Sequence, residues 1–207
     1  MNKHVGWIAG TAAAVLVAAG AITYAVAEDG GSDGAPAAGS ADAGFARDMA
    51  VHHQQAVEMS YIVRDRTDDE EVRRLAYDIA QTQANQRGML LGWLDLWELP
   101  KFSSEPPMTW MDMGSMPSGE DGALMPGMAS NTEMKKLNTL DGKQAEVFYL
   151  QLMTDHHKGG VHMAEACVKR CEVGVEKRLA QTMVNGQESE IGLMADMLKD
   201  RGAKARP

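Results

Sequence analysis

The sequence predicts an all-α fold, and three observations support this prediction. Ala, Leu, Val and sixteen Met dominate the 44% of hydrophobic residues, whereas aromatic residues make up only 5% of the chain. Such a composition favours helices over strands. Apolar residues recur at spacings of three and four, and residues 45–98 are repeated, without gaps, at 149–202. Two helical hairpins that each need a partner to bury their apolar faces pair most simply into a four-helix bundle.

The first element is an apolar stretch without charge that runs from residue 5 to residue 27. It is long enough to span a bilayer as a helix, which takes about 20 residues. Ala25-Val26-Ala27 also fits the small-x-small pattern that signal peptidases cleave. Residues 1–27 are therefore expected to be a transmembrane anchor or a signal peptide cleaved near Ala27. Either role places the rest of the chain outside the cytoplasm, and an uncleaved helix would keep it at the membrane.

Residues 28–44, "EDGGSDGAPAAGSADAG", have too few apolar side chains to fold and are expected to form a flexible linker. The chain carries 29 acidic and 20 basic residues, a formal net charge of −9. A negative protein repels nucleic acids and anionic membrane surfaces, so both are disfavoured as partners. A metal cation is a more natural ligand.

The repeat defines the organisation of residues 45–202. At the constant offset of 104, rare residues coincide, including His52 with His156, His53 with His157, and Met59 with Met163. The predicted bundle consists of repeat one (45–98), a Met-rich crossover (99–131) and repeat two (149–202), with a short helix expected over residues 131–140. In repeat one, Thr67 and Glu70 form a capping-box pattern that predicts a short loop and a new helix from about Asp68.

One stripe of the helix in repeat two carries the residues of greatest chemical interest. At 100° per residue, His156, Gly160, Met163, Cys167 and Cys171 lie within a band of about 80°. The matching residues of repeat one are His52, Ala56, Met59, Val63 and Thr67. Imidazole and thioether groups facing each other favour copper, and Cu(I) in particular, whereas zinc or iron would be expected to recruit carboxylates.

Packing is the alternative explanation of the same stripe, because buried Met usually fills space and buried His usually hydrogen-bonds to the backbone. Five of the six His residues lie in the two motifs, His162 being the fifth, and this concentration strengthens the metal hypothesis. Gln83 and Gln187 interrupt apolar stripes at matching positions. They are expected either to orient a histidine ring by a hydrogen bond or to be satisfied by backbone or water.

The crossover contains a second group of thioethers in a segment expected to be flexible and exposed. Flexible Met-rich segments can wrap Cu(I) with several sulfur atoms, although these side chains could equally cap the end of the bundle. The six residues are Met108, Met111, Met113, Met116, Met125 and Met128.

Cys167 and Cys171 are the only cysteines and lie one helical turn apart. A disulfide at this spacing would require helix distortion, because both Cβ vectors follow the helix. If the pair is reduced, it could add thiolate ligands to the stripe. If it is oxidised, it would form a local cross-link. The third interpretation is that both cysteines are small buried hydrophobic residues.

The usual hydrolase and nucleotide-binding signatures are absent from the sequence. A ferritin-like di-iron oxidase would need Glu-x-x-His motifs. The chain has only the reverse order, His162 and Glu165, with Glu58 at the position that matches His162. An enzyme is therefore not expected.

The His-His-x-x-x-Val-x-Met element in both halves, together with "WLDLWEL" and "MPGMAS", resembles the bacterial family called domain of unknown function 305, over about residues 42–202. The resemblance implies a secreted or membrane-anchored ferritin-like helical bundle, with copper binding and copper tolerance in some members. It extends the copper hypothesis to the two His-His pairs, Met59 and Met163. The first motif departs from the family pattern, because Val51 stands where Asp155 stands in the second.

The sequence therefore predicts an extracytoplasmic protein that binds and buffers copper in copper homeostasis or tolerance. The alternatives are an envelope structural or protein-interaction bundle without metal and, less favoured, a di-iron oxidase. A second copy of the chain or a copper-handling protein is a possible partner.

Overall fold

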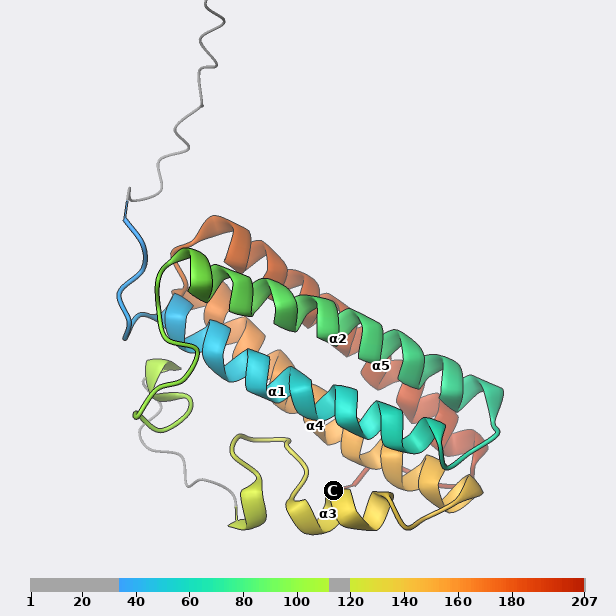
Figure 1. Ribbon diagram of the computed structural model, residues 1–207. Helices are drawn as coiled ribbons and strands as arrows, with labels where there is room; N and C mark the ends of the chain where they lie inside the picture. Colours follow the sequence, from blue (N-terminus) through green and yellow to red (C-terminus); the bar gives the residue numbers. More distant parts are fainter. Residues whose placement is uncertain (1–33, 112–119, 207) are drawn as a thin grey trace, which may run out of the picture. The chain divides into compact units, whose positions relative to one another are not determined.

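The computed structural model describes residues 34–111 and 120–206. These residues form five α-helices and two short 3-10 turns, with no strand among them. The elements are α1 (Ala41–Arg64), α2 (Glu70–Leu96), η1 (Thr109–Met111), η2 (Glu120–Gly122), α3 (Asn131–Leu137), α4 (Gly142–Arg170) and α5 (Gly174–Asp200). The four long helices lie along one another as a bundle, and α3 lies beside α4 (Figure 1). The all-α prediction is confirmed.

The predicted anchor or signal segment, residues 1–27, lies outside the described residues. Among the helices of residues 34–111 and 120–206, none is both long enough and apolar enough to cross a membrane.

The first bundle helix begins earlier than expected, inside the segment that the sequence analysis assigned to the linker. Ser40 caps α1, because its side chain accepts a hydrogen bond from the Ala43 amide. Asp42 is 2% exposed and its carboxylate accepts hydrogen bonds from the amides of Glu172 and Val173, between α4 and α5. These polar contacts order residues 41–44 in spite of their linker-like composition.

The turn from α1 to α2 also differs in detail from its prediction. Asp69, not Thr67, caps α2, since the Asp69 side chain accepts a hydrogen bond from the Val72 amide. Thr67 instead donates to the buried Glu146 carboxylate at the start of α4, at 2.6 Å. Arg201, just after α5, donates to the same carboxylate at 2.7 Å and pairs with Asp69 at 2.9 Å. This polar corner joins both hairpins at one end of the bundle.

The apolar core consists of two clusters. The first includes Phe45 and Met49 at the start of α1 and Met163 and Cys167 toward the end of α4. The second includes Met59 and Val63 toward the end of α1 and Tyr149 and Met153 near the start of α4. In both helices the paired histidines lie between the residues of the two clusters. The bundle therefore has a polar layer across its middle, with packed apolar residues on both sides.

Four of the six crossover methionines lie among the described residues and are buried or partly buried, which corrects the expectation that they are exposed. Met108, Met111 and Met125 are 2%, 2% and 4% exposed and belong to the first core cluster, and the partly buried Met128 packs against it. Asp48 fixes the segment to α1, because its carboxylate accepts hydrogen bonds from the Met108 amide at 2.7 Å and the Trp110 indole at 2.9 Å. Burial raises the pKa of Asp48.

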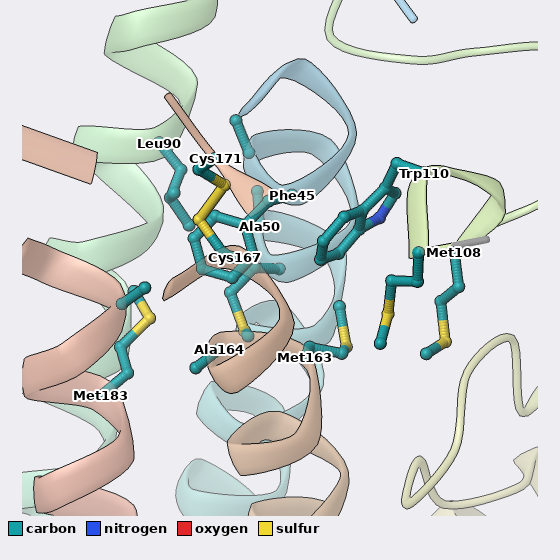
Figure 2. Close-up of a cluster of buried hydrophobic side chains, with 14 of the residues drawn as sticks. Phe45, Ala50, Leu90, Met108, Trp110, Met163, Ala164, Cys167, Cys171 and Met183 are labelled. Atoms are coloured by element: carbon teal, nitrogen blue, oxygen red, sulfur yellow. A yellow bond between two sulfur atoms is a disulfide. The ribbon is translucent and has the colours of Figure 1, made fainter. Parts of the chain in front are cut away.

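Figure 2 shows Met108 and Trp110 gathered with Met163 in this cluster. The described part of the crossover thus packs its methionines against the first core cluster. Met113 and Met116 lie outside the described residues.

Candidate metal centre

Four histidines form the polar layer, two from α1 and two from α4. His52, His53, His156 and His157 are all 0% exposed. The rings of His52 and His156 face each other with their centroids 3.7 Å apart and their planes inclined by 32°. Adjacent residues of a helix point about 100° apart, so His53 and His157 face other directions from the same helix turns.

Most of the ring nitrogens in this layer have no hydrogen-bond partner. His156 Nε2 contacts the backbone oxygen of His52 at 3.0 Å, and His157 Nε2 contacts the Glu190 carboxylate of α5 at 2.6 Å. The other six nitrogens, both of His52, both of His53, and Nδ1 of His156 and His157, meet no partner in strict hydrogen-bond geometry, although the Pro126 backbone lies near His52 and the Gln86 side chain near His53. Buried polar atoms are nearly always partnered in folded proteins, so this number of free lone pairs or N–H groups in one layer is unusual.

Burial keeps the rings of His52, His53 and His156 neutral. Loss of hydration lowers the pKa of both His52 and His53 to about 3, and the neighbouring histidines lower it further. The Pro126 carbonyl, close to His52, and the Gln86 side chain, close to His53, oppose these shifts only weakly. The pKa of His156 is lowered well below 6.5 for the same main reason. Neutral imidazole is the form that binds metal ions.

Two glycines after the second histidine pair let other chain segments come close to the layer. A Cβ atom on Gly159 would lie 2.0 Å from the Pro126 carbonyl oxygen, and one on Gly160 would lie 2.4 Å from Gln187 Oε1. Gly127, at φ +81°, passes Asp155 equally closely, since its Cβ would lie 2.3 Å from the Asp155 carbonyl oxygen. The crossover backbone therefore runs directly over the helix that carries His156 and His157.

The two methionines of the repeated motif lie on opposite sides of the layer. Met59 packs in the second core cluster and Met163 in the first, and both are 0% exposed. The structure therefore does not bring Met59 and Met163 together at one point. Each methionine can add a thioether donor to the histidine layer only from its own side of the layer.

Cys167 and Cys171 form a second group, and they are joined by a disulfide. Helix α4 ends at Arg170, and the extended backbone of Cys171 brings the two Cα atoms to 4.8 Å. The helix therefore stops where the sequence analysis expected a distortion. The first turn of α5 adds the fully buried Glu176, whose pKa burial and the nearby Asp42 carboxyl raise to about 9. No oxygen of Glu176 meets hydrogen-bond geometry with a protein partner.

Comparison with known proteins identifies the chain. The sequence profile of a domain of unknown function, DUF305, matches residues 42–198. The chain belongs to the DUF305 family.

Solved DUF305 structures share the fold. A DUF305 protein from Streptomyces coelicolor, predicted to be secreted, is 77% identical, with a TM-score of 0.77 over 83% of this chain and 99% of that chain. A DUF305 fragment from Deinococcus radiodurans is 31% identical, with a TM-score of 0.64 over 77% and 96%. CopM in its Cu(I)-bound form is 19% identical, with a TM-score of 0.59 over the same shares. No curated protein matches the chain.

The structure of this DUF305 chain separates the predicted ligands into groups. Only the paired histidines converge on one layer, whereas His162 is exposed and does not join them. No hydrogen bond links Gln83 or Gln187 to a histidine ring in the part of the chain that the structure describes, and neither atom of the Gln83 amide has a partner. The proposed orienting role of these amides is therefore not seen.

Sequence reasoning missed Glu190 and Glu176, which lie in α5 and belong to no repeated motif. It also missed the role of Gly159 and Gly160, although "HHKGG" itself was a signal that a neighbouring segment passes close to the helix.

One geometric limit applies to the histidine layer. Among the described residues, the only three His, Cys, Asp or Glu side chains whose donor atoms lie within 4.8 Å of one another are Cys167, Cys171 and Glu176. The four histidines thus do not hold three nitrogen donors ready in this conformation. The layer suits a soft ion that binds two imidazoles, or two imidazoles and one thioether. It suits an ion that needs four or more ligands less well.

Proposed function

We propose that this DUF305 protein binds copper, as Cu(I), at the histidine layer, and that it stores, buffers or hands over the ion without catalytic turnover. The ion is the cargo of the bundle. The proposed donors are two of the four imidazoles of His52, His53, His156 and His157, with a thioether from Met59 or Met163.

The observation that carries this proposal is the set of six buried ring nitrogens that meet no partner in strict hydrogen-bond geometry. A layer selected only for packing would be expected to use apolar residues, because burying a polar group without a partner costs free energy. A bound ion would satisfy several of these atoms at once. The low pKa values add support, because neutral rings can bind the ion without first releasing protons.

The relatives support copper over other metals. CopM, which shares the fold, has been solved in Cu(I)-bound, Cu(II)-bound and silver-bound forms. Silver is a soft monovalent ion like Cu(I), and the thioether groups around the layer suit both. A di-iron centre suits the layer less well, because Glu58 is exposed and the contact of Glu190 with His157 is the one carboxylate contact that the structure gives to these four rings.

The compartment is part of the same proposal. The N-terminal sequence pattern leads the chain out of the cytoplasm, and the Streptomyces coelicolor relative is predicted to be secreted. We infer that the copper site operates outside the cytoplasm, either on a membrane tether or on a released protein.

A series of single variants locates the donors. In competition with a chromogenic Cu(I) chelator, His52→Gln and His156→Gln should weaken Cu(I) binding at least about tenfold, as expected for loss of a ligand. His162→Gln is the matched control and should bind as the unmodified chain does, because His162 is exposed. Met163→Leu should weaken binding, whereas Met89→Leu, at a side chain 47% exposed, should not.

Circular dichroism and thermal unfolding of each variant separate loss of a ligand from loss of structure. Unchanged Cu(I) and Ag(I) affinity in both His52→Gln and His156→Gln would contradict the proposal. The histidines would then be core residues of a structural or protein-interaction bundle.

A further inference from the structure

The disulfide and Glu176 form a group of donor atoms that lies apart from the histidine layer. The two sulfur atoms and one carboxylate oxygen of Glu176 all lie within 4.8 Å of one another. Cys167, Cys171 and Glu176 are 0%, 2% and 0% exposed. Two sulfurs at the end of α4 and one carboxyl from the first turn of α5 thus converge in the packed interior. Figure 2 shows the disulfide within the first core cluster.

Among the described residues, Glu176 has no basic partner that would balance a buried carboxylate. Its oxygens meet no partner in strict hydrogen-bond geometry, and burial and its polar neighbour, the Asp42 carboxyl, raise the Glu176 pKa. One Asp42 oxygen already accepts the amides of Glu172 and Val173 at 2.9 and 2.8 Å. A buried carboxyl beside a second acid weakens a fold, so packing alone does not account for this residue. One of its oxygens lies within 4.8 Å of both sulfur atoms, and we infer a role with the sulfurs.

The disulfide, in turn, contributes little as a staple. It closes a loop with a sequence separation of only four residues, and short loops lose little chain entropy when they are cross-linked. The turn is already held by a backbone hydrogen bond from the Cys171 amide to the Cys167 carbonyl at 2.8 Å and by the two bonds to Asp42. Stabilisation of the fold therefore does not explain why the chain has this cysteine pair.

A hollow of about 540 Å³ lies on the solvent side of this turn. Its lining includes Arg170 and Glu172, the two chain neighbours of Cys171, together with Asp42. The hollow therefore reaches the two chain neighbours of Cys171, while Cys167, Cys171 and Glu176 themselves do not line it.

We propose that Cys167, Cys171 and Glu176 are the ligands of a second metal site, for a borderline divalent ion of the zinc class, and that the disulfide is the closed state of this site. Two thiolates and one carboxylate are a donor set that Zn²⁺ accepts, with water in the fourth position. This site is separate from the proposed copper site and does not depend on it.

Opening the site requires a dithiol reductant. The dithiol gives two electrons and two protons, the S–S bond of Cys167–Cys171 breaks, two thiols form, and the reductant becomes a disulfide. The divalent ion then displaces the two thiol protons and the Glu176 carboxyl proton, which pass to solvent, and binds the two thiolates and the Glu176 carboxylate. Reoxidation reverses the step and expels the ion. Metal retention at this site thus follows the redox state of the surroundings.

The test compares the full chain in its oxidised and dithiol-reduced states, titrated anaerobically with Zn²⁺ and, as a spectroscopic probe, Co²⁺. The reduced chain should bind one ion more than the oxidised chain and show thiolate-to-Co²⁺ charge-transfer absorption. Glu176→Gln should keep that absorption but weaken binding at least about tenfold, as expected for one lost ligand. Glu172→Gln, at an exposed neighbouring position, is the matched control and should bind normally.

Two outcomes would overturn the proposal. The first is equal binding by the oxidised and reduced chains, or no binding by either, a comparison that needs no variant. The second is equal Zn²⁺ affinity of the Glu176→Gln and Glu172→Gln variants. That result would show that the ion binds the two thiolates without the Glu176 carboxylate. A His52→Gln/His156→Gln double variant should keep the redox-dependent site, so failure of the copper proposal is distinguishable from failure of this one.

Discussion

Replacing Gly159 with alanine is expected to destabilise the protein by about 2–3 kcal/mol, the cost typical of overpacking a close contact. The new Cβ would lie 2.0 Å from the Pro126 carbonyl oxygen and 2.9 Å from its carbonyl carbon. These are backbone atoms and cannot rotate away as a side chain can. The crossover must therefore move off α4, and Met125 must leave the first core cluster with it. Urea unfolding followed by circular dichroism measures the change.

Gly192→Ala is the matched control, because Gly192 also lies within a long helix but has no atom within 4 Å of its would-be Cβ. Alanine should stabilise α5 there by about 0.5–1 kcal/mol through its better helix propensity. If Gly159→Ala is as neutral or as stabilising as Gly192→Ala, the crossover does not pack against α4 as described.

Acid is expected to unfold the metal-free protein well before its carboxylates alone would do so. The folded-state pKa of both His52 and His53 is lowered to about 3, from an ordinary value of 6.5. A lowered folded pKa means that the unfolded chain takes up the protons first. Stability is therefore full above pH 6.5 and is lost as the pH falls from 6.5 toward 3. At about 1.4 kcal/mol per unit of pH for each ring, these two residues remove about 5 kcal/mol between pH 7.5 and 4.5.

The measurement is the free energy of unfolding of the metal-free chain at a series of pH values. The slope should correspond to the uptake of about two or more protons on unfolding near pH 5, with His156 adding to the uptake in the same direction. His52→Gln should reduce this slope by about one proton, and His162→Gln, at an exposed position, should leave it unchanged. A slope unaffected by His52→Gln would show that the ring is not held neutral in the folded state.

The fold was largely predictable because it follows from residues that act locally. The spacing of apolar residues predicted the helices, and the constant offset of the repeat predicted two helical hairpins. In the structure α2 and α5 each have 27 residues, and α5 begins 104 residues after α2. The start of α1 was missed because it depends on Asp42, whose carboxylate bonds to amides 130 and 131 residues away. Sequence pattern carries no information on contacts of that range.

The candidate site was predictable only in part, for a similar reason. The paired histidines share a helix face with apolar residues, so their burial follows from helical periodicity. Met108, Met111 and Met125 of the crossover have no such period, and Asp48 holds Met108 and Trp110 against α1. The partners from α5, Glu190 and Glu176, meet α4 only through tertiary packing.

The most direct test of the copper proposal is the Cu(I) content of the full chain after equilibration with a competing chelator, measured by elemental analysis. The chain should retain copper in a fixed ratio, and a variant with glutamine at His52, His53, His156 and His157 should lose it while circular dichroism still shows a helical protein. If that variant does not fold, the His52→Gln/His156→Gln pair takes its place. Equal copper in the unmodified chain and the folded variant, or none in either, would contradict the assignment of copper to the histidine layer.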